Sequence, residues 1–286
     1  MLTLIRSFTF LLSALAYLFG VSLADYLGRP IQPVAFWLGL IIVLLLQLVT
    51  NLLPEVYRPN NEPALENETR LTRRKQRENA LYISMASLAS IAALAYLLYN
   101  ARQLPPAAFY FLVFAIAILL VYAAPPLRLL NRGFGELILA IQLAYIYPSV
   151  AFTLQYGSTH PVLVLAIPLT LLAFAWFIVQ NFQTFPQDQK YGRITLLTRL
   201  GWERVMPLHH IFVLFAYIFL LTLPAVSLPL TILAPGFLTL PFALFQILQL
   251  RNIANGAKPN WPLLQATALS VFGLTTYFLA FTFWTR

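Results

Sequence analysis

Residues 32–53 read QPVAFWLGLIIVLLLQLVTNLL and contain no charged side chain. A stretch of about 20 apolar residues is long enough to cross a lipid bilayer as an α-helix. The rest of the chain has the same character, because 60% of its 286 residues are hydrophobic and only 9% are charged. A soluble protein could not cover so much apolar surface with so few charges. The sequence therefore predicts an all-α, polytopic integral membrane protein and excludes a soluble globular or disordered chain.

Stretches of this kind recur along the whole chain. The predicted spans cover nine ranges, which are 8–28, 32–53, 80–99, 106–123, 135–153, 161–182, 207–226, 229–249 and 262–284. The first lacks an A-x-A cleavage pattern, so we interpret it as a span and not as a signal peptide. We expect nine transmembrane helices in one bundle, forming a single domain over residues 1–286. The absence of cysteine excludes disulfides, thiol catalysis and cysteine-ligated metals.

The basic residues are distributed unevenly between the two sets of loops. The side that carries the N-terminus holds every Lys and Arg residue except Arg29, Arg102 and Arg286. It also holds every acidic residue except Asp25, and the two longest loops, 54–79 and 183–206. Positive residues accumulate in cytoplasmic loops, so we expect a cytoplasmic N-terminus and a plasma-membrane location. The same bias explains the excess of basic residues without a nucleic-acid partner.

A first polar segment follows the second span and reads TNLLPEVYRPNNEPALENETRLTRR, residues 50–74. Asn51 and Glu55 are four residues apart and therefore share a helix face. Arg58 follows one turn later, and Glu62 lies beyond the proline that ends the helix. The alternative interpretation is a span end with a solvated loop.

A second segment, VYAAPPLRLLNRGFGE, connects the fourth and fifth spans over residues 121–136. Tyr122 precedes a proline pair, Arg128 and Arg132 are four residues apart, and Glu136 follows two glycines. Proline pairs and Gly-x-Gly sequences are typical of tight connections. An ordinary basic interfacial turn is the alternative.

A third segment, QNFQTFPQDQKYGRITLLTRLG, follows the sixth span over residues 180–201. Asn181, Thr184 and Asp188 share one helix face if the intervening proline only kinks the helix. Two basic residues follow, Lys190 and Arg193. A solvated loop is again the alternative.

Together the three segments bring amide, carboxylate, guanidinium and ammonium groups to one membrane face. Corresponding breaks at Asn51 and Asn181, in the second and sixth spans, indicate a binding site between helices. Guanidinium groups match phosphate oxygens, and carboxylates can hold Mg²⁺ on a diphosphate. The sequence therefore predicts an amphipathic substrate with an anionic head and a hydrocarbon tail.

These segments resemble motifs of the UbiA superfamily of membrane-embedded prenyltransferases, and the resemblance covers essentially the whole chain. The most specific match is YAAPPLRLLNRGFGE, which is similar to the family's Tyr-x-x-Pro-Pro…Arg-Gly-x-Gly-Glu connection; TNLL and YGRITLLTRLG are further matches. The resemblance implies transfer of an isoprenyl group from a prenyl diphosphate to an aromatic or lipid acceptor within membrane lipid. It also implies Mg²⁺ held by two Asp-rich motifs.

The chain departs from the family pattern at both motifs. The first, Asn-Asp-x-x-Asp-x-x-x-Asp, is replaced here by Pro54, Glu55, Arg58 and Glu62. In the second motif Asn181 and Asp188 remain, but Thr184 stands at the position of the first Asp. We therefore expect a weakened Mg²⁺ site, in which a fixed guanidinium replaces part of the ion's charge.

The resemblance implies a role for each matched residue. Tyr122 would face the carbocation with its ring, as part of a catalytic set with Asn51 and Asp188. Metal ligands would be Glu55, Glu62 and Asp188. The diphosphate would be bound by Arg58, Arg128, Lys190, Arg193 and Asn181.

Two other functions remain open. One is a non-catalytic paralogue that binds prenyl lipid. The other is a transporter, which is disfavoured because the spans carry almost no ionisable residue at mid-membrane depth. His209 and His210, at the start of the seventh span, are interpreted as interfacial residues and not as metal ligands.

Overall fold

A computed structural model describes residues 7–59, 69–226 and 228–286. Within these ranges all regular structure is helical, and nine segments are long and apolar enough to cross a membrane. The predicted all-α fold with nine spans is therefore confirmed. The side of the membrane on which the N-terminus lies stays a prediction.

The described residues contain α-helices in the following order. They are α1 (Ser7–Tyr26), α2 (Pro33–Val56), α3 (Arg70–Asn100), α4 (Pro106–Ala123), α5 (Gly135–Ile141), α6 (Tyr147–Tyr156), α7 (Ala166–Lys190), α8 (Leu196–Leu200), α9 (Trp202–Thr222), α10 (Leu230–Leu233), α11 (Leu240–Ala254) and α12 (Trp261–Trp284). A π-helical turn (Gln142–Ile146) joins α5 to α6, so the two form one span. Short 3₁₀ turns occupy Leu129–Arg132, Pro161–Leu165, Leu223–Val226 and Ala234–Thr239.

Local sequence signals explain several helix starts. Pro33 and Pro106 are the first residues of α2 and α4, where the missing N–H of proline costs no hydrogen bond. The side chain of Asn260 caps α12 by accepting a hydrogen bond from the backbone N–H of Leu263 at 3.2 Å. These signals explain where α2, α4 and α12 begin.

Several helices extend further into polar sequence than predicted, and α3, α7 and α9 are examples. α3 begins at Arg70, ten residues before the predicted span, because Thr69 caps it and residues 70–79 are mostly good helix formers. α7 continues through Pro186 to Lys190, and α9 begins at Trp202. The apolar pattern marks only the part of a helix that lies in lipid, so the two long loops are shorter than predicted.

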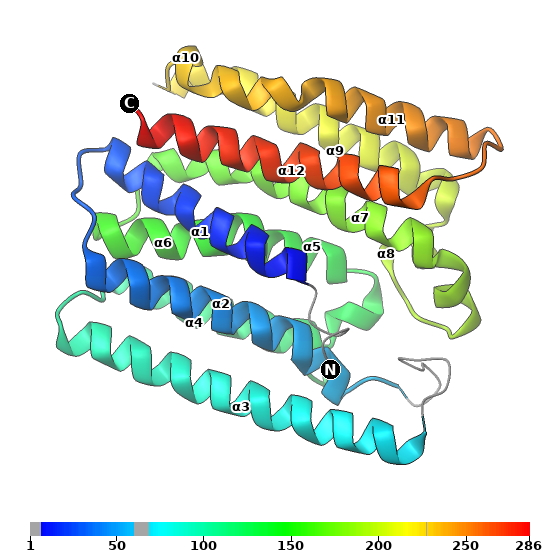
Figure 1. Cartoon of the computed structure of the whole chain (residues 1–286), viewed down its shortest axis with the longest axis horizontal. Coiled ribbons are helices and arrows are strands. Elements are labelled where there is room, and N and C mark those ends of the chain that lie inside the picture. The colour runs from blue at the N-terminus through cyan, green and yellow to red at the C-terminus, as the bar shows by residue number, and fades with distance from the viewer. Residues whose placement is uncertain (1–6, 60–68, 227) are drawn as a thin grey trace.

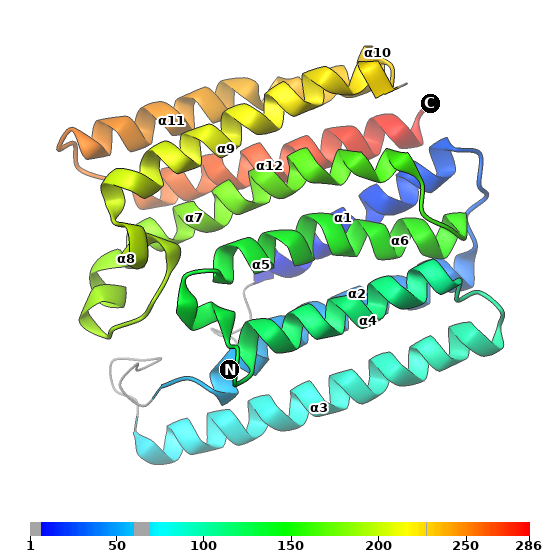
Figure 2. The ribbon, with the colours of Figure 1, turned by 180° about the vertical axis from the view of Figure 1, so that it is seen from behind.

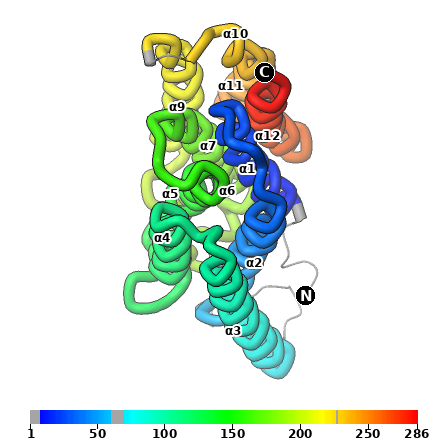
Figure 3. Tube along the Cα trace, turned by 90° about the vertical axis from the view of Figure 1, so that its left-hand side faces the viewer, coloured from blue at the N-terminus to red at the C-terminus, as the bar shows by residue number. Residues whose placement is uncertain are grey.

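The spans lie side by side with their axes roughly aligned (Figure 1). α3 packs on α2 at one edge, and α9 and α11 lie at the opposite edge, as the reverse view also shows (Figure 2). Between them, α1 contacts α6 and α12, and α7 contacts α9 and α12 (Figure 3). α2, α4 and α7 all end at the end of the bundle that carries α8, which is hereafter called the α8 end.

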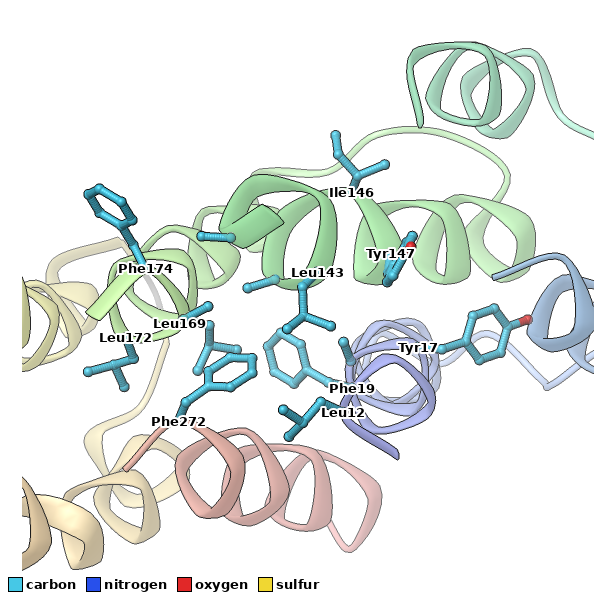
Figure 4. Packing of buried hydrophobic residues seen from close by; sticks show 14 of the residues in the cluster. Leu12, Tyr17, Phe19, Leu143, Ile146, Tyr147, Leu169, Leu172, Phe174 and Phe272 are labelled. Atoms are coloured by element: carbon cyan, nitrogen blue, oxygen red, sulfur yellow. The ribbon is translucent and has the colours of Figure 1, made fainter. Parts of the chain in front are cut away.

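Apolar side chains fill the middle of the bundle. Phe19 of α1, Leu143 of the π-helical turn, Leu169 of α7 and Phe272 of α12 point toward one another (Figure 4). Because lipid is as apolar as these side chains, close packing and not transfer out of water holds the helices together. Gly20 illustrates the closeness, since a Cβ at this position would overlap the backbone of Pro148 in α6.

The structure shows how His209 is packed. His209 is fully buried, and its Nε2 lies 3.1 Å from Nε2 of Gln246 in α11. Its Nδ1 lies 3.2 Å from that of His210. His209 lies within α9 and faces a polar partner on another span.

Candidate functional site

A buried polar network joins α1 to α2 near the α8 end. The amide Nε2 of Gln47 donates to Asn51 Oδ1 at 3.0 Å, and Asn51 Nδ2 donates to Thr9 Oγ1 at 3.2 Å. The hydroxyl groups of Ser13 and Tyr147 both donate to Gln47 Oε1, at 2.9 and 3.3 Å. Buried polar groups are costly unless they are paired. Asn51 is therefore held in one orientation by its neighbours.

The end of α2 carries an ion pair. Arg58 Nε lies 3.4 Å from Glu55 Oε2, and only 8% of the Arg58 side chain is exposed. Arg77, in the first turns of α3, donates a hydrogen bond to the backbone carbonyl of Arg58. The guanidinium of Arg58 is thus fixed beside the carboxylate that precedes it. Glu62 lies outside the described residues.

The second connection is a compact turn between α4 and α5. Tyr122 is buried in the last turn of α4, and the Pro125–Pro126 bond is cis. Arg128 follows with a φ of 40°, in the left-handed region that non-glycine residues seldom adopt.

The same connection is tied to α8 by a hydrogen-bonded chain. Arg132 Nη2 donates to the Pro126 carbonyl at 3.0 Å, and Arg199 Nη1 donates to the Arg132 carbonyl at 2.9 Å. The tight connection predicted from the proline and glycine pattern is therefore confirmed.

Glu136 links this connection to α7 and α8. It is buried at the start of α5, and its Oε1 accepts hydrogen bonds from Asn181 Nδ2 and from the backbone N–H of Leu196, the latter at 3.0 Å. Hydrogen bonds to a buried charged group are among the stronger ones in proteins. One carboxylate thus fixes the position of Asn181 relative to two other elements.

The last turns of α7 carry the third set of polar groups. Thr184 Oγ1 donates to Asp188 Oδ2 at 2.8 Å, and Arg193 Nη1 lies 3.6 Å from Asp188 Oδ1. The backbone N–H of Arg193 also donates to the Asp188 carbonyl at 2.8 Å. The predicted common face of Asn181, Thr184 and Asp188 is supported, because α7 stays helical through Pro186.

Two neighbouring cavities lie among these groups. The larger, of about 490 Å³, is bounded by α1, α7 and α12, together with Arg193. The smaller, of about 30 Å³, lies between the ends of α4, α5 and α7 and is lined by residues that include Tyr122 and Glu136. Gln180, Asn181 and Arg193 line both cavities.

The larger cavity is amphipathic. Its lining combines polar residues, among them Gln180, Asn181, Thr184 and Arg193, with apolar residues, among them Phe8, Trp176, Ala266 and Leu269. The ring of Trp176 stacks on Phe272, with centroids 6.1 Å apart and an angle of 22° between the planes. The apolar side of the cavity is thus continuous with the packed centre of the bundle.

The cavities bring some of the predicted site residues together. Tyr122, Asn181 and Arg193 line one or both. Asn51 and Asp188 adjoin the larger cavity through their partners Thr9 and Thr184, which line it. Arg58, Arg128 and Lys190 lie at the same end of the bundle but not among the lining residues of these two cavities; the side chain of Lys190 is exposed.

Sequence reasoning missed several cavity residues. The second motif ends at Glu136, but only the fold shows that this carboxylate holds Asn181. Gln180 directly precedes Asn181, which was a usable signal. Thr9 and Trp176 carried no signal, because each lies in an apolar span and reaches the cavity only through helix packing.

The described residues do not by themselves form a Mg²⁺ cage. Mg²⁺ prefers octahedral coordination by oxygen ligands. Within the ranges that the structure describes, no three His, Cys, Asp or Glu side chains cluster closely enough to hold a metal ion. Glu55 and Asp188, two of the predicted ligands, each already contact an arginine.

A cavity lined by polar and apolar groups, at one end of a bundle in which the described residues form nine apolar spans, suits a lipid with a polar head. The chain belongs to the UbiA prenyltransferase family, whose model matches residues 13–266. Members of this family are prenyltransferases, and the chain is an integral membrane protein. No curated protein sequence matches the chain at a significant level.

Solved structures share the fold at low sequence identity. A UbiA homolog from Archaeoglobus fulgidus bound to GPP and Mg²⁺ is 16% identical, with a TM-score of 0.68 over 96% of this chain and 97% of that chain. Its structure with DMAPP and Mg²⁺ has a TM-score of 0.69 at 16% identity, covering 96% of each chain. The apo UbiA homolog from Aeropyrum pernix K1 is 14% identical, with a TM-score of 0.61 over 92% and 96%.

Proposed function

We propose that this protein transfers an isoprenyl group from a prenyl diphosphate to an aromatic or lipid acceptor at the α8 end. The proposal rests on the larger cavity, whose lining combines the guanidinium of Arg193 and the amide of Asn181 with apolar side chains such as Trp176. The structural relatives from Archaeoglobus fulgidus bind GPP and DMAPP with Mg²⁺, which supports a diphosphate donor here. The single domain, residues 1–286, and the cytoplasmic face of the plasma membrane belong to the same proposal.

The proposal assigns the two sides of the cavity to the two parts of the donor. The diphosphate lies toward Arg193 and Asn181, because guanidinium and amide N–H groups donate to phosphate oxygens. The prenyl chain lies against Trp176 and Leu269, which exclude water. Further positive charge comes from Arg58, Arg128 and Lys190 at the same end.

In the reaction, the C–O bond to the diphosphate breaks and the leaving oxygen keeps the electron pair. The developing negative charge is stabilised by the arginines, and the allylic cation by the ring of Tyr122. The acceptor then forms its bond to the allylic carbon and loses a proton. Asn51 and Asp188 position the groups that line the cavity through Thr9 and Thr184.

We further propose that diphosphate binding depends less on Mg²⁺ than the family pattern implies. Mg²⁺, when bound, neutralises diphosphate charge, and a guanidinium supplies part of that charge without a metal. Arg58 stands where the family pattern has an Asp, and it neutralises Glu55 at 3.4 Å. Arg193 does the same for Asp188 at 3.6 Å. A metal ion would have to displace both arginines to use these carboxylates.

The experiment combines turnover with binding. Purified protein is given a labelled allylic diphosphate and candidate aromatic or lipid acceptors, and donor affinity is measured with Mg²⁺ and with EDTA. We expect turnover, and a donor affinity that falls less than about tenfold, or 1.4 kcal/mol, without Mg²⁺. Arg58→Asp should weaken metal-free binding by more than that factor.

Arg74→Asp is the matched control. It makes the same charge change at the same end of the bundle, at an exposed side chain whose ion pair is with Glu78. The proposal that Arg58 replaces part of the metal's charge would be disproved by two results together. The wild-type protein would bind the donor only with Mg²⁺, and Arg58→Asp would bind it at least as well as the wild type. Failure of both proteins to bind any prenyl diphosphate would disprove the enzyme assignment.

One observation favours a second function, the non-catalytic binding of prenyl lipid. Glu55 and Asp188 are each paired with an arginine, and these ion pairs compete with metal binding at the two carboxylates. Donor binding without turnover, over all acceptors and with saturating Mg²⁺, would identify this alternative. Transport is disfavoured, because the described cavity groups gather at one end while Phe19, Leu143 and Phe272 fill the middle.

A further inference from the structure

A second polar cavity lies at the opposite end of the bundle. Its volume is about 330 Å³, and it lies among the α1–α2 connection, the α3–α4 connection and the end of α6. Figure 3 views the bundle from this end. Its lining includes Arg29, Arg102, Gln103 and Gln155. Nothing in the proposed prenyl transfer uses these groups.

Both arginines bring positive charge to this cavity. Among the described residues neither makes an ion pair, and the nearby Asp25 pairs with neither. The guanidinium of Arg29 instead lies 5.2 Å above the ring of Tyr156, which stacks on Phe152. A cation held on an aromatic face keeps its N–H donors available for an anion.

Arg102 is placed at the cavity by an unusual backbone conformation. Its φ is 56°, in the left-handed region, directly after the end of α3. Glycine is the usual residue at such a position, because it has no Cβ to clash. An arginine here strains the backbone, and a bound anion would give that side chain a role that glycine cannot fill.

Gln155 adds a buried donor to the two arginines. Its side chain is 4% exposed, and its Oε1 accepts the backbone N–H of Gln32 at 2.8 Å. This bond leaves the amide Nε2 as a buried donor that has no hydrogen-bond partner in the described structure. Such orphan groups are rare in folded proteins, and a ligand oxygen would satisfy this one.

Exposed aromatic side chains surround this end of the bundle. Trp37 lies near the start of α2, Tyr99 at the end of α3 and Tyr110 near the start of α4, and all three are largely exposed. Tryptophan and tyrosine collect at the level of lipid headgroups. Their exposure at the ends of these three helices favours a position of the cavity at the level of phospholipid phosphates.

From these observations we infer that the cavity at Arg29, Arg102 and Gln155 binds the phosphate of an anionic phospholipid headgroup. The two guanidinium groups and the Gln155 amide are N–H donors of the kind that phosphate oxygens accept, and all three residues line this cavity. The acyl chains would extend along the exposed apolar faces of α2 and α4. This site is independent of the prenyl-transfer proposal.

The test measures thermal unfolding of the full chain after removal of lipid into a neutral detergent. Three probes are added separately: a short-chain phosphatidylglycerol, a short-chain phosphatidylcholine and inorganic phosphate. We expect phosphatidylglycerol to raise the wild-type unfolding midpoint by about 2–4 °C and the other two to give less than half of that shift. Equal shifts with phosphatidylcholine would overturn the anionic selectivity, and a full shift with inorganic phosphate would overturn the lipid assignment.

Two variants and a control locate the effect. Arg102→Gly removes the charge and relieves the backbone, so it should melt higher than wild type without lipid and lose most of the lipid shift. Arg29→Gln should also lose most of the shift. Arg286→Gln, a charge change at the same end, should keep it. A wild-type shift in both cavity variants would show that phosphatidylglycerol binds elsewhere and would overturn the proposal.

Discussion

The two ends of the bundle use arginine in opposite ways. At the α8 end, Arg58 and Arg193 each contact a carboxylate, at 3.4 and 3.6 Å. At the other end, Arg29 and Arg102 border a cavity and, in the described part of the chain, have no carboxylate partner. The first arrangement balances charge within the protein, and the second leaves charge to be balanced from outside.

The difference matters for how each end responds to an anion. A paired arginine must share or exchange its partner when a diphosphate arrives, which makes binding sensitive to any change in the local carboxylates. An unpaired arginine binds an anion without such an exchange. The α8 end should therefore respond strongly to substitution of acidic residues, and the opposite end mainly to substitution of basic ones.

The largest effect is expected from removing Glu136. In Glu136→Ala, Asn181 and the backbone N–H of Leu196 lose their buried acceptor. Leaving such groups unpaired should lower the free energy of unfolding by about 2–3 kcal/mol and abolish detectable prenyl transfer. Thermal unfolding and turnover are the measurements, and Glu203→Ala, at an exposed acid of α9, is the control. If Glu136→Ala is as stable as the wild-type protein, this carboxylate does not stabilise the α8 end.

The second largest effect is expected when carboxylates are restored to the proposed metal site, because donor binding should then depend more strongly on Mg²⁺. Arg58→Asp combined with Thr184→Asp restores carboxylates at both positions where the family pattern has them. More hard oxygen ligands should raise Mg²⁺ affinity, so Mg²⁺ should strengthen donor binding by at least about tenfold more than in wild type. Calorimetric titration of Mg²⁺ and donor gives both quantities. A double variant with the wild-type Mg²⁺ response would contradict the assignment of these positions to the metal site.

A smaller effect is expected at Tyr122, which lines the smaller cavity. If its ring stabilises the allylic cation, Tyr122→Leu should lower kcat by about tenfold with little change in donor affinity. Tyr122→Phe keeps the ring and should retain most of the rate. Equal rate losses in the two variants would assign the role to the hydroxyl group instead.

The smallest effect is expected at Lys190, whose side chain is exposed at the end of α7. Lys190→Gln should weaken donor binding by about twofold at low salt, and the difference should vanish at high salt, because exposed charges act through screened solvent. Donor titrations at two ionic strengths measure this. A loss that persists at high salt would place Lys190 in direct contact with the diphosphate.

The sequence predicted the fold well, because apolar stretches with the length of a bilayer allow few alternatives. Helix ends were predicted less well: α3 starts within RLTRRKQREN, residues 70–79, where helix propensity and the Thr69 cap decide and hydropathy does not. The motifs predicted that Tyr122, Asn181 and Arg193 lie close together, and all three line the smaller cavity. It could not find Thr9 or Trp176, because their neighbours come from packing between distant spans.

The π-helical turn at Gln142–Ile146 acts as a phase shift within one span. An α-helix advances by about 100° per residue, so one extra residue in a wide turn rotates everything beyond it. α5, before the turn, packs on α7, while α6, after it, packs on α1, α2 and α4. One continuous span thereby packs against two different sets of helices. Deleting one residue from the turn would preserve the helix but would rotate α6 relative to α5. The contact of Glu136 with Asn181 and the close packing of Gly20 on Pro148 could then no longer form together.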